Sequence, residues 1–98
     1  MKYEVLFRPP ARNFLKKLKD KKLKDIIFQA VQRLQNGEDI GEKKTGDLAA
    51  ISSYDIFYNK TNYELAYTRH EIGKKIVIVI SVGTRENFYK ELKRYLDS

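Results

Sequence analysis

The chain has 98 residues, 42% hydrophobic and 34% charged, with a formal net charge of +7 and no cysteine. This length fits one domain with a single core, and the composition excludes both a disordered chain and an apolar run of about 20 residues that could span a membrane. The absence of cysteine excludes disulfides and thiolate metal sites, and the N-terminus lacks the apolar block of a signal peptide, so a cytoplasmic protein is predicted.

The positive charge is concentrated in the first half of the chain. Residues 1–46 contain 12 Lys and Arg against 6 Asp and Glu, a net of +6, whereas residues 47–98 contain 8 against 7, a net of +1. The densest run is KKLKDKKLK, from Lys16 to Lys24. Such a run can attract a polyanion or an acidic protein, or it can be the solvated face of helices, and the sequence leaves both interpretations open.

The first elements are a strand and a helical region. Residues 2–8 alternate between apolar and polar positions, which is the period of a strand. Pro9 and Pro10 end it, and Pro10 suits the first turn of a helix. Apolar residues at helical spacing then predict two consecutive helices, or one kinked helix, from about residue 10 to residue 36, with Gly37 as a natural end.

The rest of the chain predicts an exposed loop over residues 37–47, a strand over 51–58, a hairpin turn over 59–62 and a strand over 63–70. A run of β-branched residues, KIVIVISV, follows and suits a central strand buried on both faces. Thr84 can cap a last helix whose inward residues are Phe88, Leu92, Tyr95 and Leu96. The order is βααβββα, an α+β fold in which a small antiparallel sheet packs against two N-terminal helices, with a short C-terminal helix, as a single domain over residues 1–98.

Three groups of side chains are candidates for chemistry. Arg85 and Tyr89 are four residues apart at the start of the last predicted helix, where backbone N–H groups favour an anion, although they can equally pair with acidic neighbours and cover the core. Aromatic residues of the strands can form a stacking platform for single-stranded nucleic acid or pack under the helices: Tyr54, Phe57, Tyr58, Tyr63 and Tyr67. His70 is the only histidine and lacks neighbouring ligands, so neither a metal site nor a cofactor is predicted.

Over nearly its whole length the sequence resembles the RelE/ParE superfamily of bacterial type II toxins. The resemblance lies in the opening strand, the two lysine-rich helices, GDL before the second strand, NYELAY in the third strand and, most specifically, VGTRENFYKEL near the end. It implies the same α+β fold and a cognate antitoxin protein as partner. RelE-like members cut messenger RNA (mRNA) on the ribosome without a metal, whereas ParE-like members inhibit DNA gyrase.

Carried over to this sequence, the RelE pattern makes Arg85 a phosphate clamp and gives Tyr89 or His70 a role in proton transfer. Glu64 stands where the nuclease pattern has an arginine, and Asp55 and Phe57 stand where it often has lysines. Each well-placed donor can stabilise a transition state by about 3–4 kcal/mol. Substitute cations for nucleic-acid binding are Lys43, Lys44, Lys60 and Arg69.

Three hypotheses follow from this resemblance. The first is a ribosome-dependent mRNA endonuclease, the second is a non-enzymatic inhibitor of DNA gyrase or another protein, and the third is an inactive homologue that only binds its antitoxin.

Overall fold

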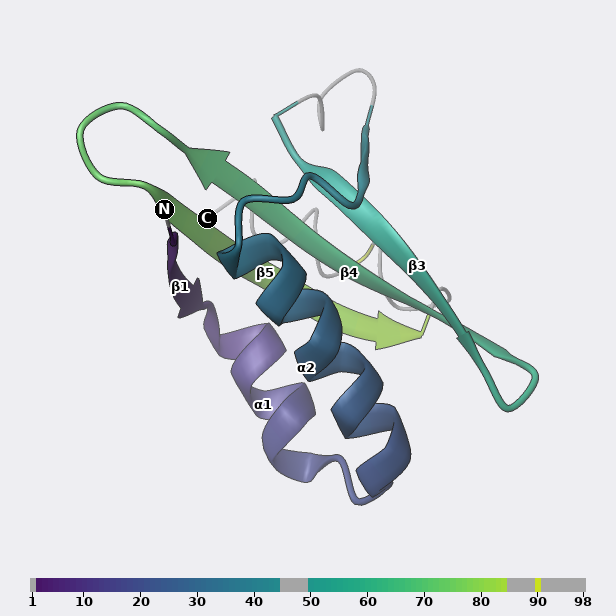
Figure 1. Cartoon of the computed structure of the whole chain (residues 1–98). Coiled ribbons are helices and arrows are strands. Elements are labelled where there is room, and N and C mark those ends of the chain that lie inside the picture. The colour runs from purple at the N-terminus through teal and green to yellow at the C-terminus, as the bar shows by residue number, and fades with distance from the viewer. Residues whose placement is uncertain (1, 45–49, 85–89, 91–98) are drawn as a thin grey trace.

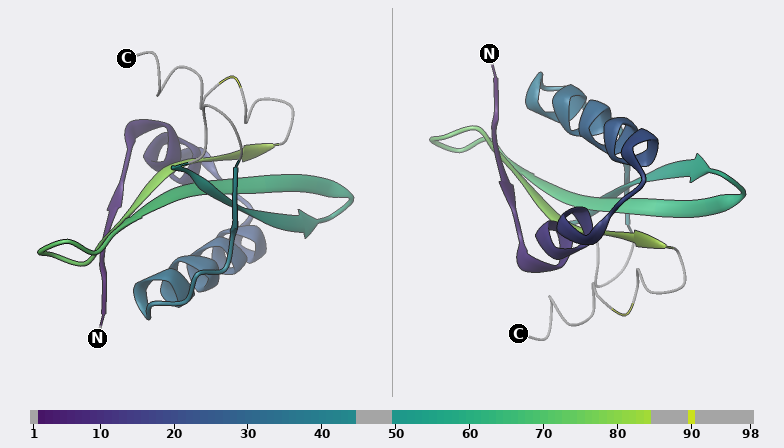
Figure 2. Two further views of the ribbon diagram at one scale, coloured as in Figure 1. Left: turned by 90° about the horizontal axis from the view of Figure 1, so that it is seen from above. Right: turned by 90° about the horizontal axis from the view of Figure 1, so that it is seen from below.

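The computed structural model describes residues 2–44, 50–84 and 90 of the chain. Its elements, in chain order, are β1 (Glu4–Phe7), α1 (Pro9–Lys17), α2 (Lys21–Gln35), β2 (Glu42–Lys43), β3 (Ser52–Tyr58), β4 (Thr61–His70) and β5 (Ile76–Thr84). Both helices cover the same face of one twisted sheet (Figures 1 and 2). The predicted α+β arrangement is confirmed over these residues, whereas the predicted C-terminal helix lies outside them except for Lys90.

Local signals explain the two helices. Pro9 and Pro10 occupy the first helical positions of α1, where a missing N–H costs nothing. The Asp20 side chain accepts hydrogen bonds from the N–H groups of Lys22 and Leu23 at 3.0 and 3.1 Å and so caps α2. Gly37 follows the end of α2 with φ of +95°, which confirms its predicted role. Because α1 ends at Lys17 and α2 begins only at Lys21, the alternative prediction of one kinked helix is wrong.

The sheet order is β1-β5-β4-β3-β2 among the described residues. β3, β4 and β5 form the predicted antiparallel series, but β1 runs parallel to β5, so the sheet is mixed and the prediction of an antiparallel sheet is wrong. The physical reason is the path of the chain. β1 pairs with β5, whose direction is fixed by the hairpins from β3 to β5 and not by any pattern within β1.

The predicted loop over residues 37–47 contains a short strand, which is the second correction. In β2, Glu42 pairs with Ser53 and Lys43 pairs with Ser52 at the edge of the sheet. The Lys44 N–H also donates to the Ile51 carbonyl oxygen at 2.8 Å. Charged residues are common on such edge strands because they discourage pairing with other chains. A charged strand of this kind has the composition of an exposed loop, so the sequence did not reveal it.

β5 confirms the prediction of a strand buried on both faces. Val77, Val79 and Ile80 have no exposed surface. A register shift places Val79 opposite Tyr67 and Ser81 opposite Ala66, so Ile80 is the additional residue of a β-bulge. β5 supplies Val77, Val79 and Val82 to a large core on one face and Ile80 to a small core on the other.

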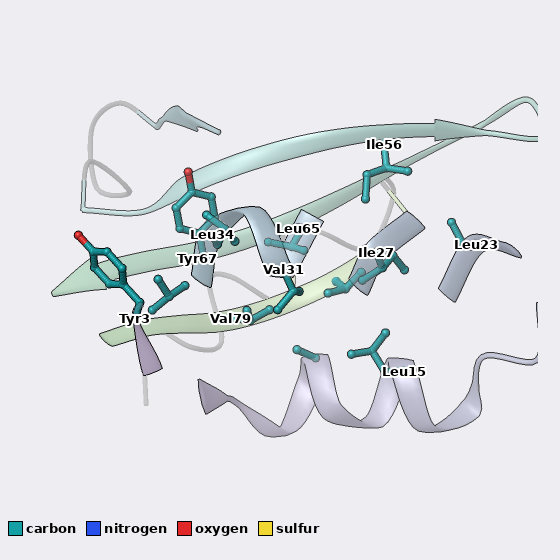
Figure 3. Close-up of a cluster of buried hydrophobic side chains, with 13 residues drawn as sticks. Tyr3, Leu15, Leu23, Ile27, Val31, Leu34, Ile56, Leu65, Tyr67 and Val79 are labelled. Atoms are coloured by element: carbon teal, nitrogen blue, oxygen red, sulfur yellow. The ribbon is translucent and has the colours of Figure 1, made fainter. Parts of the chain in front are cut away.

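The large core lies between the helices and the sheet (Figure 3). Leucine, isoleucine and valine side chains of the helices meet side chains of β3, β4 and β5, including Ile56, Leu65 and Val79. A smaller cluster consists of Ile51, Ala66 and Ile80, with Ile78 packed against it. In the part of the chain that the structure describes, no helix is long and apolar enough to cross a membrane.

Candidate functional site

The candidate site lies on the sheet face opposite α1 and α2, here called the far face. Ile56 and Leu65 belong to the large core under the helices, so strand alternation puts their neighbours Asp55 and Glu64 on the far face. These two acidic residues are directly opposite each other in the pairing of β3 with β4. Side chains in such a pair start from Cβ atoms about 5 Å apart, and like charges there are unfavourable.

Glu64 is the most deeply placed acidic residue of this face, with only 2% of its surface exposed. Its Oε2 atom lies 3.9 Å from the Nζ atom of Lys44. A buried carboxylate requires such a partner because its hydration is lost. Lys44, predicted to bind nucleic acid, is thus also a counter-ion of Glu64.

A hollow of about 370 Å³ opens beside this ion pair. Its walls come from β3, from Glu64 of β4 and from the segment that contains β2: Ile40, Glu42, Lys44, Ser53, Tyr54, Asp55 and Glu64. Among the described residues of the lining, three carboxylates against one lysine give a formal charge of −2, in a chain of net charge +7. This part of the lining is therefore acidic, which opposes the binding of a phosphate group.

The predicted nucleic-acid-binding lysines are divided between the two ends of β3. Lys43 is exposed in β2 and Lys44 follows it, both near the start of β3. Lys60 is exposed in the hairpin after β3, where Asn59 and Lys60 have φ of +50° and +64°. Seven residues of strand separate these ends, which is roughly 20 Å. Lys43 and Lys44 therefore lie at one end of β3 and Lys60 at the other, and of the three only Lys44 lines the hollow.

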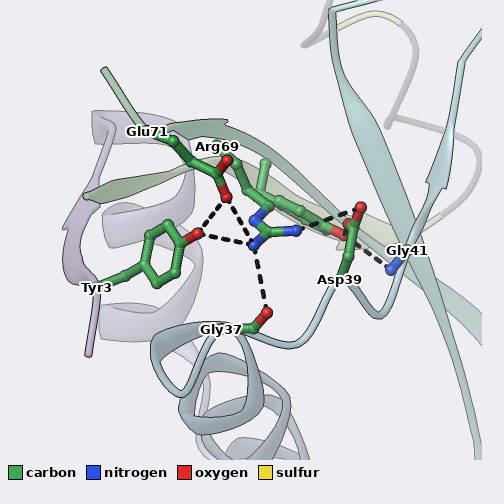
Figure 4. Close-up of polar contacts among 7 residues, drawn as sticks. Tyr3, Gly37, Asp39, Gly41, Arg69 and Glu71 are labelled. Carbon is green, nitrogen blue, oxygen red and sulfur yellow. Dashed lines mark hydrogen bonds and ion pairs between the residues drawn. The ribbon is translucent and has the colours of Figure 1, made fainter. Parts of the chain in front are cut away.

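Arg69, another predicted cation, lies in a polar cluster that joins four parts of the chain (Figure 4). Its Nη2 atom donates to the Tyr3 hydroxyl at 2.9 Å, to the Gly37 carbonyl at 3.2 Å and to the Glu71 carboxylate at 3.1 Å. Its Nη1 atom lies 3.4 Å from Asp39. Desolvation alone would lower the pKa of Arg69, but the Tyr3 hydrogen bond and the two carboxylates raise it.

Tyr67 forms a second part of this cluster. Its hydroxyl donates to Asp39 Oδ1 at 2.6 Å and accepts from the Gly41 N–H at 2.8 Å. Burial, followed by the hydrogen bond to Asp39, raises the pKa of Tyr67 to about 12. Nothing in the sequence predicted these contacts, because Asp39 and Tyr67 are 28 residues apart and the only signal was a strand tyrosine.

The aromatic residues of the strands divide between the two interpretations left open by the sequence. Tyr67 belongs to the large core, and Tyr54, Tyr58 and Tyr63 are partly buried against it. Phe57 alone of this group projects into solvent, with 70% of its surface exposed. The described structure therefore supports packing for the four tyrosines and leaves one aromatic side chain for contact with a partner.

Of the three predicted catalytic residues, only His70 lies in the part of the chain that the structure describes. His70 is exposed, and its Nε2 atom lies 3.1 Å from Thr68 Oγ1. It pairs with Ile76 at one end of β5, whereas Thr84 at the other end pairs with Tyr63. Arg85 and Tyr89 lie outside the described residues, so their roles stay predictions. Among the described residues no group of three His, Asp or Glu side chains is placed to hold a metal ion.

With two helices on one face of a mixed sheet, this chain has the fold of the RelE toxins. It is similar to the toxin in the RelBE2 toxin–antitoxin complex of Mycobacterium tuberculosis, with 26% identity and a TM-score of 0.65 over 87% of this chain and 100% of that one. A free mutant of the Escherichia coli RelE toxin has 24% identity and a TM-score of 0.66 over 96% and 98%. The toxin of the intact E. coli RelBE complex has 25% identity and a TM-score of 0.57 over 83% and 94%.

The chain belongs to the family of ParE-like toxins of type II bacterial toxin–antitoxin systems, whose model matches residues 5–93. This confirms the resemblance drawn from VGTRENFYKEL and the other motifs. No curated protein matches the chain.

Proposed function

We propose that this toxin arrests growth by binding a protein target, with DNA gyrase as the first candidate, and that a cognate antitoxin holds it inactive. The observation that carries the proposal is the pairing of Asp55 with Glu64 at positions where the nuclease pattern has cations. The sequence analysis placed mRNA cleavage first, whereas this acidic pair on the far face supports a binding function.

Cleavage of RNA by its own 2′-hydroxyl builds negative charge on the phosphate, and donors aimed at that charge each contribute about 3–4 kcal/mol. Two facing carboxylates would instead repel the negative charge that develops on the phosphate and so destabilise the transition state. The single lysine of the hollow lies beside Glu64, so much of its charge is already balanced within the chain.

Two further observations support a binding toxin. The matching family is described as ParE-like, and ParE-like members of the superfamily act without nuclease chemistry. The lysine-rich run is also almost wholly solvent-exposed around the junction of α1 and α2, with Lys16, Lys17, Lys19, Lys21 and Lys22 all exposed. Such a surface can steer an acidic protein toward the toxin.

The proposed antitoxin rests on the solved relatives. The M. tuberculosis and E. coli structures are complexes of a RelE-like toxin with its antitoxin, and this chain shares their fold. We expect a short protein encoded in the neighbouring reading frame to bind this toxin and suppress its effect.

The second candidate function is ribosome-dependent mRNA cleavage, which the motif VGTRENFYKEL and the likeness to RelE structures favour. In that function Arg85 would clamp the phosphate, Tyr89 or His70 would transfer the proton, and Lys44 or Lys60 would replace missing cations. A nuclease site here would have to bind an RNA phosphate in spite of repulsion from the acidic side chains of the hollow.

One expression experiment separates the two functions. The toxin is induced without its antitoxin, mRNA ends are mapped on ribosomes, and gyrase-linked DNA breaks are counted, each for wild type and Arg85→Ala. We expect growth arrest with intact messages and accumulated breaks. Codon-phased mRNA ends that disappear in Arg85→Ala would establish the nuclease instead.

A further inference from the structure

The segment from Gly37 to Lys44, here called the latch segment, connects α2 to the edge of the sheet. Its middle is held by a single side chain from the centre of β4. The Gly41 N–H donates to the Tyr67 hydroxyl at 2.8 Å, and that hydroxyl donates to Asp39 Oδ1 at 2.6 Å. Tyr67 itself has no exposed surface. One buried hydroxyl thus contacts the latch segment at two points.

Gly41 shows how closely the latch segment approaches the sheet. A Cβ atom at this position would lie 2.6 Å from the Ser53 carbonyl oxygen and 2.9 Å from the Tyr67 ring. Only glycine avoids these contacts, because the nearest atom is backbone of β3 and cannot move alone. The close approach lets Glu42 and Lys43 pair with β3 as β2.

Arg69 gives the latch segment a second anchor at its beginning. The guanidinium lies 3.4 Å from Asp39 Oδ2 and donates to the Gly37 carbonyl at 3.2 Å. Asp39 therefore receives Tyr67 on one carboxylate oxygen and Arg69 on the other, as Figure 4 shows. Asp39 is fixed although its side chain is 46% exposed.

The latch segment also builds the candidate site. Ile40, Glu42 and Lys44 are three of the seven residues that line the acidic hollow, and all three belong to this segment. Lys44, at its end, brings its ammonium group to the buried Glu64. If the latch segment moved away from Tyr67, the hollow would lose one wall and Glu64 would lose this ion pair.

We propose that Tyr67 and Asp39 are positioning residues of the toxin, which fix the latch segment so that Lys44 and Glu42 complete the far-face hollow. The inference rests on the proposed function, because it treats this hollow as part of the surface that acts on the target. Tyr67 and Asp39 act through Lys44 and Glu42 and need not contact the target themselves.

Tyr67→Phe tests the inference, because it removes the hydroxyl and keeps the ring in the core. The control is Tyr58→Phe, whose hydroxyl donates to Asp20 at 3.1 Å at the other end of the sheet. We expect hydrogen exchange at the Gly41 and Lys44 amides to become at least about tenfold faster in Tyr67→Phe, with α2 amides unchanged. Tyr58→Phe should leave the Gly41 and Lys44 amides as in wild type.

In the functional part of the test, growth arrest is measured at matched expression for Tyr67→Phe, Lys44→Met and the double variant Tyr67→Phe/Lys44→Met. We expect Tyr67→Phe to weaken growth arrest. The double variant should cause the same degree of arrest as Lys44→Met alone, because Tyr67 acts through the segment that carries Lys44. If Tyr67→Phe does not fold, Asp39→Ala removes the hydrogen bond between Tyr67 and Asp39 together with the Arg69 ion pair. Asp39→Asn keeps an acceptor for Tyr67 and should restore most of the exchange protection.

Unchanged exchange at Gly41 and Lys44 in Tyr67→Phe, or fully additive loss of arrest in the double variant, would overturn the positioning role. A wild-type chain that causes no arrest would overturn the proposed function, and the exchange data would still decide whether the latch segment depends on Tyr67. The two failures are therefore distinguishable.

Discussion

Glu64 is the residue on which the proposed function depends most. Its carboxylate is almost fully buried in β4, opposite Asp55 and 3.9 Å from the Lys44 ammonium. A buried carboxylate is tolerated when an opposite charge lies close to it, and removing one partner is then more costly than replacing both. The ion pair therefore contributes to the stability of the fold and is also part of the candidate site.

We expect Lys44→Met to lower the free energy of unfolding by about 2–4 kcal/mol, because it leaves a buried carboxylate without this lysine. Lys43→Met is the matched control, since Lys43 is exposed, and it should change stability by less than about 0.5 kcal/mol. The double variant Lys44→Met/Glu64→Leu should regain most of the loss. Urea denaturation measures all three, and equal losses for Lys43→Met and Lys44→Met would contradict the assignment.

Tyr67 predicts a distinct pH dependence. Its pKa is raised from 10.0 to about 12, so the folded state holds the phenolic proton more tightly than the unfolded state does. The resulting stabilisation is fully present below pH about 10 and is lost as the pH rises toward 12. At about 1.4 kcal/mol for each pKa unit, reduced by solvent screening around Asp39, the loss should be about 1–2 kcal/mol.

The measurement compares denaturation of wild type and Tyr67→Phe between pH 9 and pH 12, where the deprotonation of lysines affects both proteins alike. The stability advantage of wild type should shrink across this range. An advantage that stays constant would mean that the hydroxyl of Tyr67 has an ordinary pKa.

At the scale of elements, local sequence predicted the helices and the β3–β4–β5 series well. Prolines at the start of α1 and Gly37 after α2 are signals that act within a few residues. The strand β1 was predicted, but its parallel pairing with β5 and the strand β2 were not, because distant partners determine both. The contact between Tyr3 and Arg69 spans 66 residues and the contact between Asp39 and Tyr67 spans 28.

For the candidate site, too, the sequence revealed residue identities, whereas the contacts between them depend on the fold. The identities of Asp55 and Glu64 were visible in the sequence as departures from a family pattern, but their direct opposition required the strand register. Lys44 was predicted only as a cation for nucleic acid, because nothing local shows that it faces a buried glutamate. Arg69 likewise looked free in the sequence and contacts two carboxylates in the fold.

The β3–β4 hairpin offers a prediction of its own. Both central residues of its turn have positive φ, and a lysine in that conformation costs roughly 1 kcal/mol. Lys60→Gly should therefore raise the free energy of unfolding by about 0.5–1 kcal/mol, whereas Asn59→Gly should raise it less because asparagine tolerates this conformation. Thermal denaturation of the two variants tests this, and a destabilised Lys60→Gly would contradict the turn geometry.

In the part of the chain that the structure describes, basic and acidic side chains gather on two different surfaces. Most of the net charge of +7 lies in the first 46 residues, including the exposed lysines at the α1–α2 junction, while the described lining of the far-face hollow has a formal charge of −2. A single polyanion such as mRNA would meet attraction at one surface and repulsion at the other. A protein target can match both, because its own surface can present both signs of charge.

The most direct test of this account uses purified toxin in two parallel reactions. One contains ribosomes programmed with a defined mRNA, and the other contains DNA gyrase with relaxed plasmid and ATP. We predict that the wild-type toxin leaves the mRNA intact and inhibits supercoiling, while adding the antitoxin restores gyrase activity. Cleavage of the mRNA at the codon in the ribosomal A site, with gyrase unaffected, would contradict the account.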